Sequence, residues 1–506
     1  MHPMKKIFLL FTLWLAVVNV RAALPQPDLI AQIHFAGAQK ISAAANFSAF
    51  TNEFCSAEAV VLRAQTANRL SVWLAGWLQK NTGVTVADGA AKLRPLFDDL
   101  QKSEWFLETR AAANGKPHVA IVIQLDTARA QIWQTSLKLF FPTTGFKFSD
   151  GWLTFVPDAN SSTLGNSLFK KIFQPVDKNA WLVLDVNWPN LAQWNPDLIT
   201  LGMPETQFTV TAPDDNLRIN GKFYFPENLA LNLEPWRVPT NTLHQPFVSF
   251  TAVRGFSKWF AAQPWAQAYQ LSPTPNQYFT WAMAQIPYQT FAALPVANAA
   301  DALAQAYARL QPLVQPQPGA PGMFLASSKL TLTNNEIFLT GVPFISPFMR
   351  VVNEPAGQFL LAGAFPNTPR SKPLPPELFQ RLAEKNLVFY HWEITAERLP
   401  TALNLSQLGF VLTSHRQLGG ESAAMKWIQK TAPKLGNTVT EIFQIAPDQM
   451  TFTRKSPGIF TAVEMLALGN WLEAPNFPGC DLRLPQRSSL KNLHPRPPAG
   501  LPAPSK

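Results

Sequence analysis

The residue pair with the clearest capacity for acid–base chemistry is His391 and Glu393, which are separated by one residue in an apolar segment. In a β-strand, residues two positions apart point to the same face of the sheet, so the imidazole and the carboxylate are expected to be neighbours. Such a pair could act as acid and base, or supply part of a metal site. The favoured interpretation is nevertheless a polar pair on the exposed face of a half-buried sheet.

One serine lies in a pattern that resembles the Gly-x-Ser-x-Gly turn of esterases. In Gly420–Ala424 the last glycine of that pattern is replaced by alanine. The turn also requires a strand that ends at its first glycine, whereas the predicted strand Leu408–Thr413 ends well before it. The one later histidine, His494, lies in the C-terminal tail. Ser422 is therefore interpreted as the N-cap of a helix.

A second serine, Ser167, is followed three residues later by Lys170. This spacing resembles the Ser-x-x-Lys motif of penicillin-binding proteins and β-lactamases, in which the lysine can activate the serine. The companion Lys-Thr-Gly motif of those enzymes does not occur in the sequence. An amphipathic helix is the preferred interpretation.

The remaining acidic residues and histidines form no cluster in the sequence. No two of the seven histidines lie within about five residues of each other, which excludes the common metal-binding spacings. The adjacent carboxylates Asp98–Asp99 and Asp214–Asp215 are expected in a helix and in a turn. Neither Gly-x-Gly-x-x-Gly nor a Walker A sequence occurs. We therefore predict no catalytic residue, no metal site and no cofactor.

The composition excludes several classes of protein. Of the 506 residues, 47% are hydrophobic, 12% aromatic and 15% charged, so a charge-rich disordered chain is excluded and a large buried core is expected. The 45 prolines predict short elements rather than a coiled coil. The formal net charge is +10, but the basic residues are spread thinly, and nucleic-acid binding is not expected.

The first residues have the layout of a secretory signal peptide. Lys5 and Lys6 precede an apolar run over residues 7–18, which is shorter than the ~20 residues that span a bilayer. Cleavage is predicted after Ala22, and no cysteine lies near this position to carry a lipid anchor. No later window is long and apolar enough to span a membrane. The mature chain is therefore expected in the periplasm or outside a bacterium.

The chain has two cysteines, Cys55 and Cys480. An oxidising compartment permits a disulfide between them, which would attach the C-terminal tail to the first domain. Two unpaired thiols are an equal alternative. The tail, residues 474–506, is rich in proline and in basic residues, and it is predicted to be largely disordered.

Helix and strand patterns alternate along the chain, which predicts an α+β fold. The expected helices cover residues 57–77 after the N-cap Ser56, Asn298–Leu310 and Ser422–Thr431. Pro312 is expected to end the second of them. Polar turn residues separate four pairs of strand-forming runs. The predicted hairpins are Trp105–Ala112 with His118–Leu125, Phe146–Phe148 with Trp152–Phe155, Gln207–Thr211 with Leu217–Phe225, and Lys329–Thr333 with Glu336–Thr340.

Apolar residues of the first helix recur every three or four positions and predict one buried face. They are Val60, Ala64, Ala67, Leu70, Leu74 and Trp77. Most of the 16 tryptophans, including Trp73, are likewise expected in the core. If several of them lined a concave surface instead, they would form an apolar or carbohydrate-stacking groove.

A weak internal repeat predicts two similar domains in tandem. Ala212–Asp214 is echoed by Ala446–Asp448, and Lys178–Leu184 is echoed by Lys385–Tyr390. A spacing of roughly 220 residues is too long for a solenoid, so each copy is expected to form a mostly antiparallel sheet of hairpins covered by helices. Chance similarity among hairpins is the alternative. The expected organisation is a signal peptide (1–22), a first α+β domain (23–239), a second α+β domain (240–473) and the tail (474–506).

These observations lead to two hypotheses from different classes. The first is an exported, non-enzymatic protein that binds an apolar ligand or a protein partner in the bacterial cell envelope. The second is a secreted hydrolase whose catalytic residues are dispersed in the sequence, as those of many triads are. An assembly factor that acts through the basic tail is a weaker third.

Overall fold

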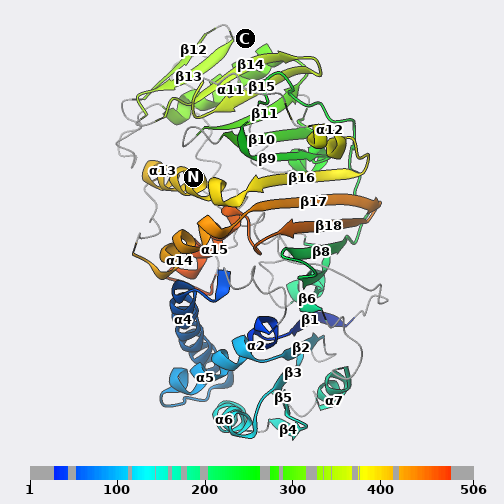
Figure 1. Cartoon of the computed structure of the whole chain (residues 1–506), viewed down its shortest axis with the longest axis vertical. Helices are drawn as coiled ribbons and strands as arrows, with labels where there is room; N and C mark the ends of the chain where they lie inside the picture. Colours follow the sequence, from blue (N-terminus) through cyan, green and yellow to red (C-terminus); the bar gives the residue numbers. More distant parts are fainter. Residues whose placement is uncertain are drawn as a thin grey trace, which may run out of the picture.

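The computed structural model shows an α+β protein with one long antiparallel sheet (Figure 1). The sheet has 18 strands, and the described part of the chain also contains twelve α-helices. The predicted signal peptide with its predicted cleavage site after Ala22, and residues 480–506 of the tail, which include Cys480, lie outside the described residues. The structure describes residues 28–43, 53–111, 117–142, 144–157, 162–171, 179–193, 203–244, 246–262, 274–283, 289–314, 328–333, 335–342, 345–366, 374, 376–413 and 421–479.

The strands form two sets that follow each other in the sheet. From one edge to the middle, the order is β4 (Gly145–Ser149), β5 (Trp152–Val156), β3 (His118–Gln124), β2 (Trp105–Arg110), β1 (Leu29–Phe35), β6 (Ala180–Val186), β7 (Glu205–Thr211) and β8 (Leu217–Tyr224). From the middle to the other edge, the order is β18 (Gln449–Ser456), β17 (Asn437–Ala446), β16 (Leu387–Ile394), β9 (Phe247–Arg254), β10 (Gln277–Met283), β11 (Thr290–Val296), β15 (Gly357–Gly363), β14 (Phe348–Glu354), β13 (Glu336–Thr340) and β12 (Lys329–Leu332).

The two sets are joined where β8 pairs with β18 over the full length of both strands. At this junction Phe208, Phe223 and Phe452 pack with ring centroids 5.5 and 6.2 Å apart, edge to face. The three rings belong to one buried cluster that contains residues from both sets of strands. The expected two sheets are therefore one continuous sheet in this protein.

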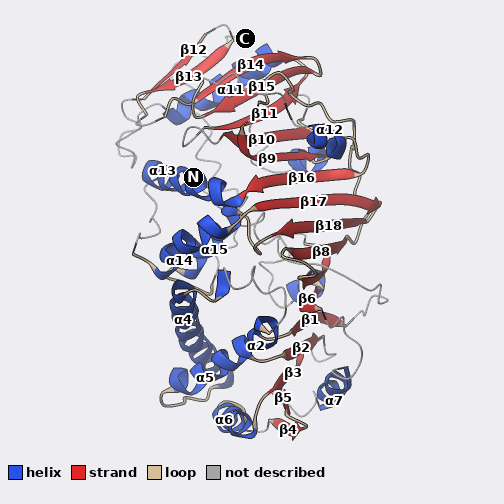
Figure 2. Cartoon of the chain, viewed as in Figure 1, coloured by secondary structure: helices blue, strands red, loops and turns tan. Residues whose placement is uncertain are grey.

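Helices lie on both sides of the sheet (Figure 2). On the left of Figure 1 lie α4 (Ala57–Thr82), α5 (Gly89–Lys102), α13 (Thr395–Thr413), α14 (Ala423–Thr431) and α15 (Ala462–Leu472). On the right lie α7 (Ser162–Lys171) and α12 (Pro376–Leu382). The remaining helices are α2 (Ala38–Ser42), α6 (Thr127–Lys138), α8 (Trp188–Ala192), α9 (Ser257–Ala262) and α11 (Ala299–Val314).

The four predicted hairpins are confirmed. They are the pairs β2–β3, β4–β5, β7–β8 and β12–β13, and all four are antiparallel. The turn between β4 and β5 has positive φ angles of 54° at Asp150 and 78° at Gly151, the backbone region that glycine and aspartate tolerate best. The turn chemistry of the sequence therefore located these strands correctly.

Two of the predicted element boundaries are wrong. Helix α11 continues to Val314, two residues beyond Pro312, which the sequence analysis expected to end it. The segment Leu408–Thr413, predicted as a strand, forms the last turns of helix α13. A short apolar run has no periodicity that separates a strand from a buried helix, and here the helix that begins at Thr395 simply continues through it.

The predicted buried face of α4 is also wrong in part. Val60 and Trp77 are 50% and 48% exposed, whereas Ala67 is fully buried. The N-terminal part of α4 packs through Leu62 against a cluster that includes α14 and α15, and its C-terminal part packs through Leu78 against α5 and α6. Because the contacts change direction along the helix, one apolar stripe does not describe its burial.

The described chain stays packed beyond Glu473, where the sequence analysis placed the start of the tail. Phe477 is buried, and its ring contacts Trp471 with centroids 4.9 Å apart. The guanidinium of Arg69 lies over the same ring at 5.0 Å and donates hydrogen bonds to the carbonyls of Leu472 and Ala474. Residues 474–479 are thus attached to α4.

None of the helices described in the structure is long and apolar enough to cross a membrane.

Candidate functional site

The two serines with nucleophile-like patterns occupy ordinary helical positions. Ser422 accepts a hydrogen bond from the backbone N–H of Met425 at 3.2 Å, so it caps α14 as predicted. Ser167 and Lys170 are exposed on α7. Within the described part of the chain, neither serine hydrogen-bonds to a histidine that could activate it.

The adjacent carboxylates hold helices and a turn in place. Asp99 of α5 accepts hydrogen bonds from Arg129 and from Trp133 Nε1 of α6, which brace the two helices. Asp214 pairs with Arg218 at 2.6 Å across the turn between β7 and β8. These contacts agree with the helix and turn positions expected for the two pairs.

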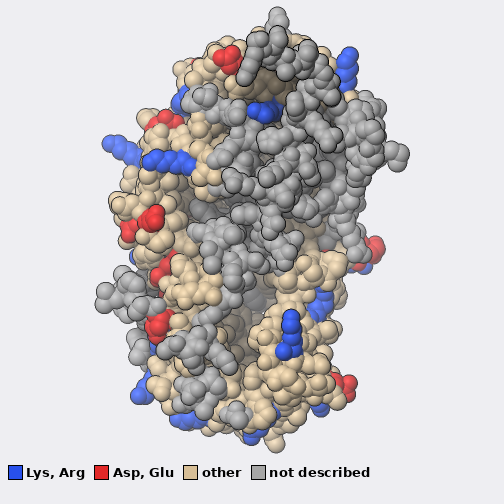
Figure 3. Space-filling model, turned by 180° about the vertical axis from the view of Figure 1, so that it is seen from behind, with Lys and Arg blue, Asp and Glu red and all other residues tan. Residues whose placement is uncertain are grey.

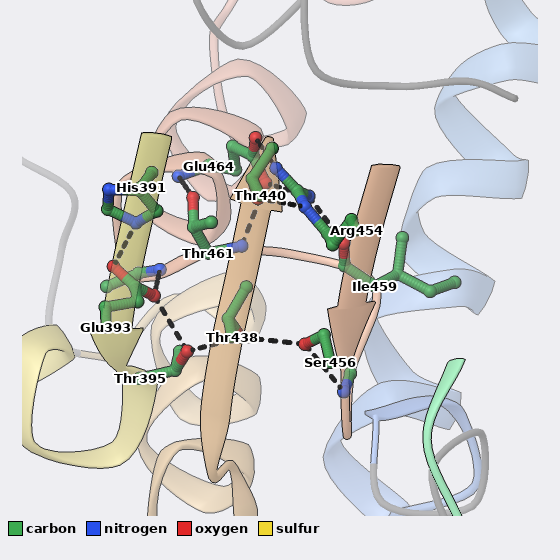
Figure 4. Close-up of polar contacts among 12 residues, drawn as sticks. His391, Glu393, Thr395, Thr438, Thr440, Arg454, Ser456, Ile459, Thr461 and Glu464 are labelled. Atoms are coloured by element: carbon green, nitrogen blue, oxygen red, sulfur yellow. Dashed lines mark hydrogen bonds and ion pairs between the residues drawn. The ribbon is translucent and has the colours of Figure 1, made fainter. Parts of the chain in front are cut away.

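The pair His391 and Glu393 lies on β16, with both side chains on the same face, as predicted. Their Nε2 and Oε2 atoms are 3.2 Å apart (Figure 4). The side chains are only 16% and 1% exposed, because α13 and α15 lie over this face of the sheet. The favoured expectation of a polar pair on an exposed face is therefore wrong.

Glu393 is surrounded by hydrogen-bond donors. Its Oε1 accepts from Thr395 Oγ1 at 2.7 Å and from the backbone N–H of Ala462 at 2.8 Å, at the start of α15. Burial alone would raise the pKa of Glu393, but the hydrogen bond and charge of His391 and these two donors outweigh it and lower that pKa. The carboxylate is thus held ionised at the N-terminus of α15.

A second buried charge pair fixes the other side of α15. Arg454 of β18 donates two hydrogen bonds to Glu464, at 2.8 and 2.9 Å, and a third to Thr440 Oγ1 (Figure 4). Glu464 also accepts from the backbone N–H of Thr461, which completes a capping box. Both charged side chains of this pair have hydrogen-bond partners, so the first role of the pair is to attach α15 to the sheet.

Glu53 approaches the same region from the segment that precedes α4. Its carboxylate accepts from the backbone N–H of Ile459 at 2.9 Å, and its side chain is fully buried. Burial raises the pKa of Glu53 to about 8, although the donors of Ile459 and Phe460 act in the opposite direction. This carboxyl group therefore holds a proton at neutral pH, unlike Glu393.

The one arrangement in this region that resembles a catalytic relay includes Thr251, which sequence reasoning missed. Thr251 of β9 lies directly opposite His391, and its Oγ1 is 2.8 Å from His391 Nδ1. Hydroxyl, imidazole and the carboxylate of Glu393 thus form a continuous chain. A signal was present, because Ser249 and Thr251 alternate with apolar residues in β9 and so must share one face.

A second cluster of polar residues, which sequence reasoning also missed, lies on β6 and β7. Asp185 is opposite Gln207, whose Nε2 donates to it at 3.3 Å. Burial, followed by the charge of Glu205, raises the pKa of Asp185 to about 6, and burial also raises the pKa of Glu205. A raised pKa suits a proton donor, but no sequence pattern marks these residues because sheet pairing alone brings them together.

An exposed aromatic surface lies on the C-terminal half of α4. Trp73 and Trp77 are 45% and 48% exposed, and their rings are stacked with centroids 6.4 Å apart. Val72, beside them, is 63% exposed. Gly76 has no side chain, and the space that a Cβ atom would occupy there is open. We call these four residues the α4 platform. It contradicts the expectation that Trp73 and Trp77 belong to the core.

Comparison of the chain with protein-family models, curated proteins and solved structures gives no match. Within the residues that the structure describes, no group of three or more histidine, cysteine, aspartate or glutamate side chains could hold a metal ion. Cys55 is exposed, and its expected partner Cys480 lies outside the described residues, so the disulfide stays a prediction.

Proposed function

We propose that this protein is an exported binding protein of the bacterial cell envelope and that the α4 platform is where it contacts the apolar surface of a partner protein. The observation that carries the proposal is the exposure of Trp73 and Trp77 side by side on one helix. Tryptophans contribute disproportionately to binding energy at protein interfaces. Isolated apolar residues on a surface need no explanation, but a contiguous aromatic group favours an interaction site.

The surroundings of the platform support the same proposal. Val72 extends the apolar surface, and Gly76 leaves room for a flat partner surface to approach the helix backbone. Only 15% of the residues are charged, and on the face seen in Figure 3 the Lys, Arg, Asp and Glu side chains are scattered over the described surface rather than gathered in one patch. A partner would therefore be recognised mainly through apolar contact.

Site-specific photo-crosslinking tests this function. A photoreactive phenylalanine at Trp77 is expected to yield one discrete adduct in the native compartment, and the Trp73→Ser/Trp77→Ser variant is expected to bind the captured partner at least ~10-fold more weakly. Ile445, which is 52% exposed on β17, provides the matched control position. No adduct at Trp77, or the same adduct at both positions, would contradict the proposal.

The intact mass of the recovered chain also tests export, since cleavage after Ala22 leaves Ala23 as the first residue.

The second candidate function is hydrolysis, which is favoured by the chain of Thr251, His391 and Glu393. In this role Thr251 is the nucleophile, His391 the base and Glu393 the orienting acid. A fluorophosphonate probe is then expected to phosphonylate the hydroxyl of Thr251 with loss of fluoride, and Thr251→Ala is expected to lower kcat by ~1,000-fold or more. Thr280, on the neighbouring strand, is the control for substitution by alanine. Unmodified Thr251 in a fully folded preparation eliminates this function.

We also propose that the chain arose by duplication of one α+β unit, with copies at residues 23–239 and 240–473. Three features support this. The strand order β4-β5-β3-β2-β1-β6-β7-β8 is matched element by element by β14-β15-β11-β10-β9-β16-β17-β18. β6 has a bulge after Ala180 where it pairs with β7, and β16 has one after Leu387 where it pairs with β17. Gly37, two residues after β1, and Gly255, one residue after β9, both have φ of 83°.

A further inference from the structure

Arg398 lies close to the N-terminus of α13, which follows β16 directly. Its Nη1 reaches Thr290 Oγ1 at 3.4 Å, at the start of β11. In the sheet, β9 and β10 lie between β16 and β11. Because Arg398 follows β16 in the chain and contacts β11, its side chain extends from α13 across β9 and β10. Figure 1 shows α13 beside the ends of β16 and β9.

The sheet beneath Arg398 is rich in small hydroxyl side chains. One row of directly opposite residues runs from Glu393 through Ser249 and Ala282 to Thr290. The next row on the same face runs from His391 through Thr251 to Thr280. Cross-strand partners share a face, so serine and threonine side chains line the surface that Arg398 covers.

Arg398, which is half-buried, has fewer acceptors than the two fully buried arginines Arg254 and Arg454. Arg454 is paired with Glu464, and Arg254 donates to four backbone carbonyls. Among the described residues Arg398 forms no ion pair, and its hydrogen bond to Thr290 is long. A guanidinium has five N–H donors, so most of the donors of Arg398 are available to a ligand.

The carboxylate of Glu393, whose charge acts on Arg398, does not fill this role. Both oxygens of Glu393 are engaged, one by Thr395 and Ala462 and the other by His391. Burial lowers the pKa of Arg398, and the charge of Glu393 only partly offsets this effect. Tyr278 lies two residues before Thr280 on β10, so its side chain is on the face that carries Thr280. Burial raises the pKa of Tyr278, and the charge of Arg398 acts against that rise.

We propose that Arg398, together with the hydroxyls of Thr290 and Tyr278, forms a binding site for an oxyanion, the carboxylate or phosphate group of a small ligand. The planar guanidinium donates in the two parallel directions that a carboxylate or phosphate accepts. The hydroxyls supply further donors, and the neighbouring cross-strand pair Ala282 and Ser249 carries only small side chains. The site is separate from the α4 platform and does not depend on it.

Thermal unfolding of the full mature chain, at constant ionic strength, tests the site with two probes: inorganic phosphate and octanoate. At least one probe is expected to raise Tm with a saturable dependence on its concentration, because it binds the folded state alone. Arg398→Gln is expected to abolish that increase. Arg381→Gln provides the control, since Arg381 pairs with Glu441 in a different part of the molecule. A response to phosphate alone assigns a phosphate group, and a response to octanoate alone assigns a carboxylate.

Arg398→Gln could lower stability enough to obscure the titration, so Thr290→Val serves as a second variant. It removes one hydroxyl and keeps the shape of the side chain, and it is expected to weaken probe binding several-fold without abolishing it. The site is overturned if neither probe produces a saturable increase in the wild type, or if Arg398→Gln and Thr290→Val both respond as the wild type does.

Discussion

At the scale of single residues, His391 has one partner on its own strand, Glu393, and one on the neighbouring strand β9, Thr251. The two-residue period of a strand was enough to place His391 beside Glu393. Their partner Thr251 is supplied by β9, and which residue of β9 faces His391 depends on a register that no local pattern determines. The same holds for Asp185 and Gln207 on β6 and β7.

Glu53 allows a prediction of how stability depends on pH. Its pKa is raised from an ordinary value of 4.5 to about 8 in the folded chain. Between these values the folded chain keeps a proton that the unfolded chain has released, so the contribution of Glu53 to the unfolding free energy decreases as pH rises from about 4.5 to 8. Glu53→Gln removes this titration. Between pH 5 and 8, the unfolding free energy of the wild type is expected to fall by about 3–4 kcal/mol more than that of the variant.

Urea unfolding at a series of pH values measures this difference. Glu421→Gln is the control, because Glu421 is an exposed residue whose pKa lies below its ordinary range, so its charge does not change in this window. Parallel pH profiles for the wild type and Glu53→Gln would show that Glu53 is ionised in the folded chain and that its burial is compensated.

At the scale of elements, local chemistry was a reliable guide where it acts on the backbone. Ser56 and Ser422 each accept a hydrogen bond from a backbone N–H group at the start of a helix, and Asp150 tolerates the positive φ of its turn. These residues therefore mark the ends of the elements that they flank. Apolar pattern was a weaker guide. It failed for Leu408–Thr413 and for the exposed face of α4, since burial there depends on packing partners that are distant in the sequence.

At the scale of the whole molecule, the α+β class and four of the hairpins were accessible from the sequence, but the number of strands and the continuity of the sheet were not. The junction depends on β8 and β18, which are separated by half the chain. If the strand correspondence begins at the bulges of β6 and β16, the counterpart of Asn220 is Thr453, and these two residues lie directly opposite each other at the junction. The two proposed copies would therefore be related by a twofold axis through that pair.

This arrangement predicts how the two copies behave when they are separated. Fragments 23–240 and 241–479, expressed together, are expected to form a 1:1 complex with the near-UV circular dichroism of the intact chain, because the junction buries Phe208 and Phe452 from opposite fragments. The first fragment alone is expected to dimerise through its free β8 edge. Size-exclusion chromatography with light scattering distinguishes these species. A first fragment that stays monomeric, and fragments that fail to associate, would contradict the duplication.

The ends of the sheet bear on the solubility of the protein. An open sheet of this size offers two strand edges to other chains, and they belong to β4 and β12, which have five and four residues. Each edge carries an exposed lysine, Lys147 on β4 and Lys329 on β12. Short edges that carry a positive charge are poor templates for a further strand. We therefore expect both edges to disfavour end-to-end joining of the sheets of two molecules.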